Sequence, residues 1–241
     1  AEYIANKETC GAKTVFATII GRTNAGKSSL LNAVIGEKIA SVSSKSQTTR
    51  TRITGIKTID DIQLVFMDTP GLHKPKNKLS NHMLNAVRES VADIDVVVFM
   101  ADCTKKLSNQ EEHMLSDLSS GKTHLIYVLN KIDLLENKSD LVPIISELSG
   151  KYNFDSIIPI SVTENNGVDI VVSEVMKFAS DSPHFFPDDM ITDQPEKVIA
   201  SEIIREKLLN LLNDEVPHGI AVTDEKMSER DDKDILDIDA V

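Results

Sequence analysis

Residues 21–28 read Gly-Arg-Thr-Asn-Ala-Gly-Lys-Ser, the pattern G-x-x-x-x-G-K-[ST] of a phosphate-binding loop. The two glycines let the backbone curl so that its N–H groups point at bound phosphates. Lys27 is expected to reach the β- and γ-phosphates, and the Ser28 hydroxyl to bind Mg²⁺. An apolar, β-branched run at 14–20 precedes the loop and an amphipathic segment at 28–35 follows it, so a strand, the loop and a helix come in the required order. The predicted phosphate-site residues are Gly21, Arg22, Thr23, Asn24, Ala25, Gly26, Lys27, Ser28 and Ser29.

A second motif, Asn130-Lys131-Ile132-Asp133, follows another apolar run at 125–129. Guanine offers an N1–H and an N2–H₂ donor that one carboxylate can accept together, whereas adenine offers no such pair. Asp133 is expected to accept both donors, Asn130 to bond the other edge of the base, and Lys131 to lie along the loop. The motif ends a predicted strand, which is where open α/β sheets bind their ligands. We therefore expect a guanine nucleotide, and the motif disfavours a P-loop kinase or ATPase.

A third motif, Asp68-Thr69-Pro70-Gly71, directly follows the apolar run at 62–67. An Asp at the end of this second strand is expected to help hold Mg²⁺. The Gly71 N–H can contact a γ-phosphate and lose that contact after hydrolysis, which would make the segment a switch. A threonine upstream is expected to bind Mg²⁺ as well: Thr49 is the first choice and Thr48 the alternative. The predicted metal ligands are Ser28, Thr49 and Asp68, and the predicted nucleotide contacts of this motif are Asp68, Thr69, Pro70, Gly71 and Leu72.

Predicted strands alternate with predicted helices, which is typical of a doubly wound α/β domain with a mostly parallel sheet. A hairpin of 51–59 and 62–67 adds one antiparallel strand. Three prolines fall within 181–196, which indicates a stiff linker. The predicted domains are 1–180, the linker 181–196 and a smaller domain at 197–241. Further strands are expected at 96–101, 125–129 and 157–160, with short ones at 219–222 and 235–238. Helices are expected at 28–35, 77–91, 138–151, 167–180 and 197–212. One more helix is expected to begin at a capping box, residues 108–111.

The three motifs resemble those of TRAFAC-class GTPases, and the exact residues in and around them resemble the bacterial Era family. The stretches that carry this second resemblance are Gln47-Thr48-Thr49-Arg50, Asp68-Thr69-Pro70-Gly71-Leu72-His73 and Ala200-Ser201-Glu202-Ile203-Ile204-Arg205-Glu206-Lys207-Leu208. The likeness runs over residues 10–241, and the last stretch is its most specific part because generic GTPases lack it.

The resemblance implies hydrolysis of GTP to GDP, binding to small-subunit ribosomal RNA and the small ribosomal subunit, and peripheral contact with the inner face of the cell membrane. It also implies that the backbone of Ser161 and Val162 contacts the guanine, although the family has alanine in place of Val162. Residues 197–241 would begin a KH-type RNA-binding domain, which clamps nucleotide backbone with a G-x-x-G loop. Gly219 is the only glycine beyond Gly167, so we expect this KH-like domain to be partial.

Catalysis is expected to rest on Lys27, Thr49, Gly71 and Asn24. Ras-like GTPases carry a water-orienting glutamine where this chain has Leu72, and leucine can neither orient nor deprotonate water. We therefore expect slow intrinsic turnover. Asn24 offers a remedy, because an asparagine at this loop position binds K⁺ in related GTPases and so supplies charge like that of an arginine finger. The alternative is a docking module that responds to GTP and GDP with negligible turnover.

Charge and cysteine content limit the partners and the compartment. The chain has a net charge of −12, of which residues 181–241 contribute −11 and the rest −1. An acidic tail is a poor electrostatic match for nucleic acid. The two cysteines, Cys10 and Cys103, form no metal-binding or C-x-x-C spacing and favour a reducing, cytoplasmic location. We expect a monomer with no secretion signal and no membrane-spanning segment.

Overall fold

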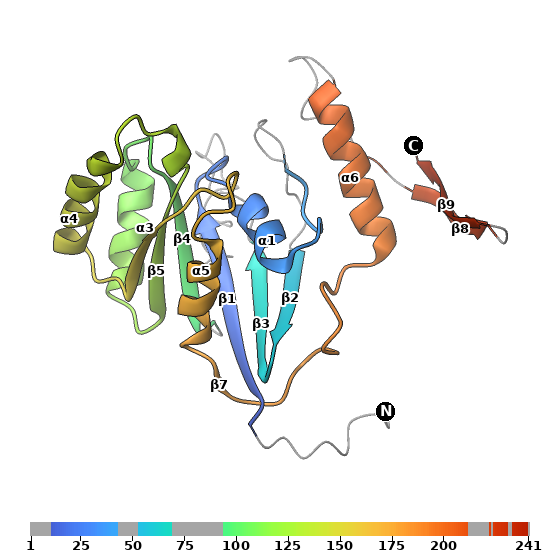
Figure 1. The fold of residues 1–241 in the computed structure, drawn as a ribbon, viewed down its shortest axis with the longest axis horizontal. Coiled ribbons are helices and arrows are strands. Elements are labelled where there is room, and N and C mark those ends of the chain that lie inside the picture. The colour runs from blue at the N-terminus through green and yellow to red at the C-terminus, as the bar shows by residue number, and fades with distance from the viewer. Residues whose placement is uncertain are drawn as a thin grey trace.

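A mixed β-sheet with helices on both faces forms the main body of the chain (Figure 1). Six of its strands lie side by side in one series. The computed structural model describes residues 11–42, 53–68, 94–211, 222, 224–230 and 233–240. The strands lie in the order β2-β3-β1-β4-β5-β6, and only β2 on this path is antiparallel to its neighbour. The strand bounds are β1 Lys13–Gly21, β2 Ile53–Ile59, β3 Ile62–Asp68, β4 Val96–Asp102, β5 His124–Asn130 and β6 Ser156–Pro159.

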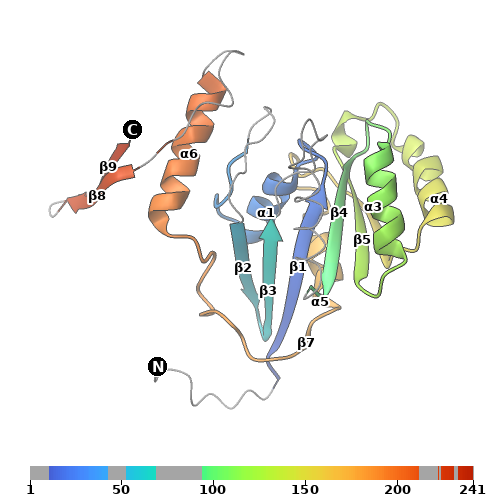
Figure 2. The same cartoon turned by 180° about the vertical axis from the view of Figure 1, so that it is seen from behind.

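Each central strand supplies side chains to two apolar cores, one on each face of the sheet. On one face the core includes residues of the helices α1, Lys27–Ile35, and α5, Val168–Met176. On the other face it includes residues of α3, Asn109–Ser119, and α4, Leu141–Lys151 (Figure 2). In β4, for example, Val98 belongs to the first core and Phe99 to the second. Because both faces are covered, the strands are continuous apolar runs, and the predicted doubly wound class is confirmed.

The predicted elements within the described residues are largely confirmed, with three corrections. The capping box at Ser108 and Glu111 opens α3 as expected. The segment predicted as one helix over 138–151 begins with a 3-10 turn, Lys138–Asp140, before α4. The helix predicted over 167–180 ends at Met176, because the chain turns there and Ser180–Asp181 pairs with β1 as a short antiparallel strand, β7. The helix predicted at 77–91 lies outside the described residues.

The third correction concerns the C-terminal part, where a helix, α6, Glu196–Leu211, precedes a hairpin of β8, Asp224–Arg230, and β9, Lys233–Ala240. The strand expected at 235–238 lies within β9. Val222 belongs to no strand, and the rest of the strand expected at 219–222 lies outside the described residues. Sequence reasoning missed β8 because Asp-Glu-Lys-Met-Ser-Glu-Arg holds one apolar residue and no alternation. Pairing with β9 overrides this weak local preference.

The proline-bearing segment at 181–196 is bound to the sheet rather than free. The buried amide of Gln63 accepts hydrogen bonds from the backbone N–H groups of Phe185 and Phe186, at 2.8 and 3.0 Å, and donates to the Phe186 carbonyl at 2.9 Å. The ring of Phe185 meets that of Phe16 edge to face. These contacts fix the path by which the chain reaches α6.

Candidate nucleotide-binding site

The predicted phosphate-binding loop joins the end of β1 to the start of α1. Asn24 and Gly26 both have positive φ angles, of 62° and 107°, which is the curled backbone expected of an anion-binding loop. A Cβ at Gly21 would lie 2.1 Å from the Met100 carbonyl oxygen, and one at Gly26 would lie 2.3 Å from the Asn130 Nδ2. Both glycines are therefore required by close neighbours as well as by the backbone conformation.

Lys27 is buried and its side chain folds back over the loop. Its Nζ donates to the Arg22 carbonyl at 3.0 Å, so the ammonium group lies across the curl of the backbone. Ser28 and Ser29 follow in the first turn of α1, where the N-terminal end of the helix dipole favours an anion. The structure thus brings together the predicted phosphate-site residues from 21 to 29.

Asn130, at the end of β5, connects three segments of the site. Its Nδ2 donates to the Ala25 carbonyl of the phosphate loop at 2.8 Å, and its Oδ1 accepts from the Val162 N–H at 3.2 Å. Sequence reasoning expected Asn130 and the Val162 backbone to contact the base. In this structure they hydrogen-bond to each other. Together with the bond from Asn130 to Ala25, this contact fixes the position of the Asn130–Asp133 motif relative to the phosphate loop.

Asp133, the residue predicted to bind guanine, belongs to the same motif as Asn130. Its Oδ1 is buried and has no hydrogen-bond partner among the described residues. A buried carboxylate oxygen without a donor is costly, so a ligand that supplies N–H donors would be bound strongly at this point. The preceding Ile132 is buried and donates its N–H to the Ile160 carbonyl at 3.2 Å, which fixes the turn that carries Asp133.

Asp102, which sequence reasoning missed, holds Lys131 of the same motif. It ends β4 directly opposite Asn130 in the sheet register. Its Oδ2 accepts from Lys131 Nζ at 2.8 Å, and its Oδ1 accepts from the backbone and hydroxyl of Thr104. Burial alone would raise the pKa of Asp102, but these hydrogen bonds outweigh it and hold the pKa at about 2. The signal available in the sequence was an Asp at the end of an apolar strand.

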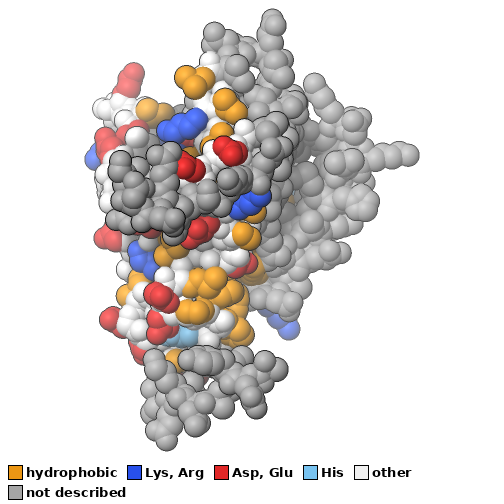
Figure 3. Space-filling view, turned by 90° about the vertical axis from the view of Figure 1, so that its right-hand side faces the viewer, with side chains coloured by type: hydrophobic (Ala, Val, Ile, Leu, Met, Phe, Trp, Pro, Cys, Tyr) orange, Lys and Arg blue, Asp and Glu red, His pale blue; other side chains and the backbone are white. Residues whose placement is uncertain are grey.

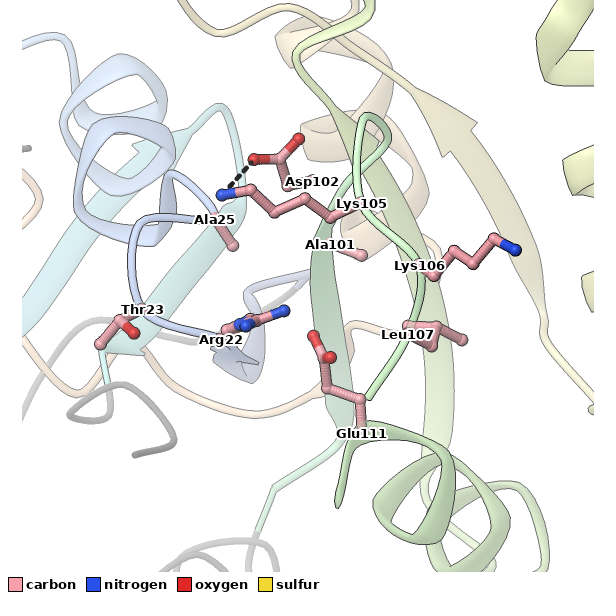
Figure 4. A pocket seen from close by; sticks show the side chains of 9 residues that line it. All are labelled: Arg22, Thr23, Ala25, Ala101, Asp102, Lys105, Lys106, Leu107 and Glu111. Atoms are coloured by element: carbon pink, nitrogen blue, oxygen red, sulfur yellow. Dashed lines mark ion pairs between the residues drawn. The ribbon is translucent and has the colours of Figure 1, made fainter. Parts of the chain in front are cut away.

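A small pocket separates the outer side of the phosphate loop from the loop that follows β4 (Figure 4). Arg22 and Thr23 line it from one side, and Lys105 and Leu107 from the other. Its volume of about 10 Å³ is room for roughly one water molecule. The pocket is therefore too small to bind a nucleotide or another organic ligand.

The predicted magnesium ligands lie only in part within the described residues. Asp68 ends β3 opposite Ile19 of β1, which places its backbone beside the start of the phosphate loop. Within the described ranges, no group of three His, Cys, Asp or Glu side chains could hold a metal ion. Hydroxyl, carboxylate and phosphate oxygens are the donors that Mg²⁺ prefers, and it usually binds through few protein ligands. Ser28 and Asp68 fit that chemistry; Thr48, Thr49, Thr69, Pro70, Gly71, Leu72 and Cys10 lie outside the described residues.

The low pKa of Asp102 predicts a pH-dependent contribution to stability. Because the pKa is about 2 in the folded chain, below the ordinary 3.8, the contribution is present near neutral pH and is lost as the pH falls from about 4 toward 2. Asp102→Asn should lower the free energy of unfolding by about 1–2 kcal/mol near neutral pH, with a smaller loss near pH 2. Urea unfolding measures this, with the exposed Asp140→Asn as the control. An equal loss at both pH values would contradict the assignment.

Comparison with known proteins agrees with this geometry. Residues 16–131 match a family described as 50S ribosome-binding GTPase. The GTPase Era of Clostridioides difficile (strain 630) is 46% identical over 229 residues, which are 95% of this chain and 77% of that protein. A crystal structure of Era in complex with MgGDPNP and nucleotides 1506–1542 of 16S ribosomal RNA matches with a TM-score of 0.85 and 34% identity, over 95% of this chain and 78% of that one.

The Era of Ruminiclostridium cellulolyticum is 44% identical over 91% of this chain and 74% of its own length. A single-residue variant of Aquifex aeolicus Era bound to GDP·AlF₄⁻ matches with a TM-score of 0.85 and 33% identity, over 95% of this chain and 78% of that one. These likenesses run through the phosphate loop and the base motif and continue into the C-terminal part. The chain belongs to the Era family of GTPases.

Proposed function

We propose that this chain binds GTP with Mg²⁺, hydrolyses it to GDP and phosphate, and acts as a switch on small-subunit ribosomal RNA. The observation that carries the nucleotide part is the buried Oδ1 of Asp133, which has no hydrogen-bond partner among the described residues. Asn130, in the same motif, bonds to the phosphate loop. A site that leaves a carboxylate oxygen unsatisfied at this position is complementary to the paired donors of guanine.

The roles of the phosphate-loop residues follow from their positions in the structure, and the other roles follow from the sequence motifs. Lys27 and the loop N–H groups would offset the charge that develops on the β- and γ-phosphates. Ser28 and Asp68 would hold Mg²⁺, with Thr49 or Thr48 as a further ligand, and the ion would neutralise charge on the same phosphates. Gly71 would report the presence of the γ-phosphate. Positioning and charge neutralisation supply most of the catalysis in such enzymes.

The ribosomal part of the proposal has separate support. A solved relative holds nucleotides of 16S ribosomal RNA together with a GTP analogue. We propose the division into a GTP-binding domain at 1–180, a linker at 181–196 and a partial KH-like domain at 197–241. We further propose a cytoplasmic monomer with peripheral contact to the inner face of the membrane. No helix in the described part of the chain is long and apolar enough to span a bilayer.

Exchanging the donor and acceptor pattern at Asp133 should change the base that is bound. Asp133→Asn places an amide N–H₂ where guanine has an amino group, so GDP affinity should fall by about 100-fold or more. Xanthosine diphosphate carries a carbonyl at that point and should bind the variant more tightly than GDP. Fluorescent-nucleotide titration measures both affinities, with Asp140→Asn as the matched control. If the variant still preferred GDP, Asp133 would not be the residue that selects the base. If ATP displaced GDP from the unaltered chain at an equal concentration, the kinase or ATPase interpretation would be favoured.

Potassium should accelerate hydrolysis through Asn24, which lies exposed in the phosphate loop. The chain lacks the water-orienting glutamine, so the added positive charge should raise turnover in K⁺ over Na⁺ on the order of tenfold or more. Asn24→Ala should remove the difference, and Lys27→Ala serves as the inactive control in a phosphate-release assay. Equal turnover in the two salts would exclude the potassium role. Turnover no faster than that of Lys27→Ala in both salts would favour the docking module.

A further inference from the structure

A second and larger cavity lies beside α3 and α4, on the face of the sheet opposite α1 (Figures 1 and 2). It is lined by the loop that follows β4, residues 102–107, by Glu112 of α3, by two residues of β5 and by one face of α4. Its volume of about 420 Å³ is within the range of small-molecule binding sites. None of its lining residues belongs to the phosphate loop or to the Asn130–Asp133 motif, so the cavity is separate from the nucleotide site.

The part of the cavity formed by β5 and α4 is apolar and partly aromatic. Tyr127 and Leu129 of β5 line it together with Leu148 of α4, and all three belong to the apolar core on this face. The Tyr127 ring stacks on that of Phe99, with centroids 5.6 Å apart, and meets the ring of Phe154 at 5.0 Å. These contacts hold the Tyr127 ring in place. A planar aromatic molecule would bury apolar area on this wall and extend the group of packed rings.

The loop that follows β4 supplies two lysines to the cavity. Lys105 Nζ lies 3.3 Å from Asp102 Oδ2, which also accepts from Lys131 at 2.8 Å. Because Lys131 and Thr104 keep Asp102 hydrogen-bonded, the half-exposed Lys105 can turn to another anion at little cost in free energy. The ion pairs of the described residues do not include Lys106, whose side chain points away from the phosphate loop (Figure 4). The loop therefore offers positive charge to a ligand.

The helices supply the opposite charge. Glu112 of α3 pairs with Lys151 of α4 at 2.6 Å, and the exposed Glu147 of α4 has no ion pair within the described residues. The loop side of the cavity is thus net positive and the helix side net negative. The face that bears α6 differs, because the acidic and basic side chains described there are interspersed (Figure 3). An anionic group in the cavity would be favoured at the loop and disfavoured beside Glu147.

We propose that this cavity binds a small, planar aromatic anion, with its ring against Tyr127 and Tyr152 and its charged group at Lys105 and Lys106. Apolar contact supplies most of the affinity, and the two lysines fix the orientation of the ligand, which is the usual division of roles in a small-molecule site. The carboxylate of Glu147 disfavours the reversed orientation. The cavity does not depend on the proposed nucleotide function, and it can be occupied while a nucleotide is bound.

The probe for the test is 8-anilinonaphthalene-1-sulfonate, an aromatic anion that fluoresces in apolar surroundings. It is titrated into the full 241-residue chain at low salt, with GDP and Mg²⁺ in excess. Lys106→Gln removes a positive charge and should weaken binding about 3–5-fold, and Glu147→Gln removes a negative charge and should strengthen it about 2–3-fold. Lys122→Gln and Glu136→Gln, which make the same charge changes at exposed positions outside the cavity, are the matched controls.

A variant that fills the cavity tests where the probe binds. Ile144→Trp places a larger side chain in the lining and should weaken binding by about tenfold or more. Val142→Trp, on the same helix at a position that is 68% exposed and outside the lining, is its control. The uncharged 1-anilinonaphthalene should bind the unaltered chain, and Lys106→Gln should leave its affinity unchanged.

Four results would overturn the proposal: no binding of the probe, its displacement by GDP, equal affinity in Ile144→Trp and the unaltered chain, or equal affinity in Lys106→Gln and Glu147→Gln. The two charge variants alter exposed side chains, so they keep the test decisive if Ile144→Trp is unstable. Failure of GDP to bind would count against the proposed nucleotide function alone, because the probe needs no nucleotide.

Discussion

The nucleotide site depends on the side-chain amide of Asn130. It donates to the Ala25 carbonyl in the phosphate loop and accepts from the Val162 N–H, so segments far apart in the sequence meet at one buried group. A buried amide must satisfy its hydrogen-bonding groups, and shifting either loop would leave one of them without a partner. The distance between the phosphate loop and the base motif is therefore set by the protein before any nucleotide arrives.

The sheet explains why this group lies where it does. Asn130 and Asp102 end neighbouring parallel strands in register, and Asp68 ends β3 opposite Ile19 of β1. Two apolar cores hold these strands in one sheet, so their carboxyl ends meet at the edge where the phosphate loop begins. The loop that continues from α1 is hydrogen-bonded to Asn32 of α1 and to Glu206 of α6.

The sequence predicts the parts of this arrangement that local chemistry determines. The phosphate loop, the apolar strands and the capping box at Ser108 each have a signal within a few residues, and the structure has them where they were expected. Contacts between distant segments have no such signal. The pairing of Asp102 with Lys131, the use of the Val162 N–H by Asn130 and the docking of the proline-bearing segment on Gln63 depend on the folded sheet. Likewise β8 exists because β9 pairs with it.

Hydrogen exchange in the nucleotide-free chain tests most directly whether Asn130 organises the site. Asn130→Ala should speed amide exchange in both the phosphate loop, residues 21–28, and the segment around Val162, because each loses its partner. Asp133→Asn, which changes only the group predicted to bind the base, should leave exchange in the phosphate loop unchanged. If Asn130→Ala exchanged like the unaltered chain in both segments, Asn130 would act only on the nucleotide, and the account of a preformed site would be wrong.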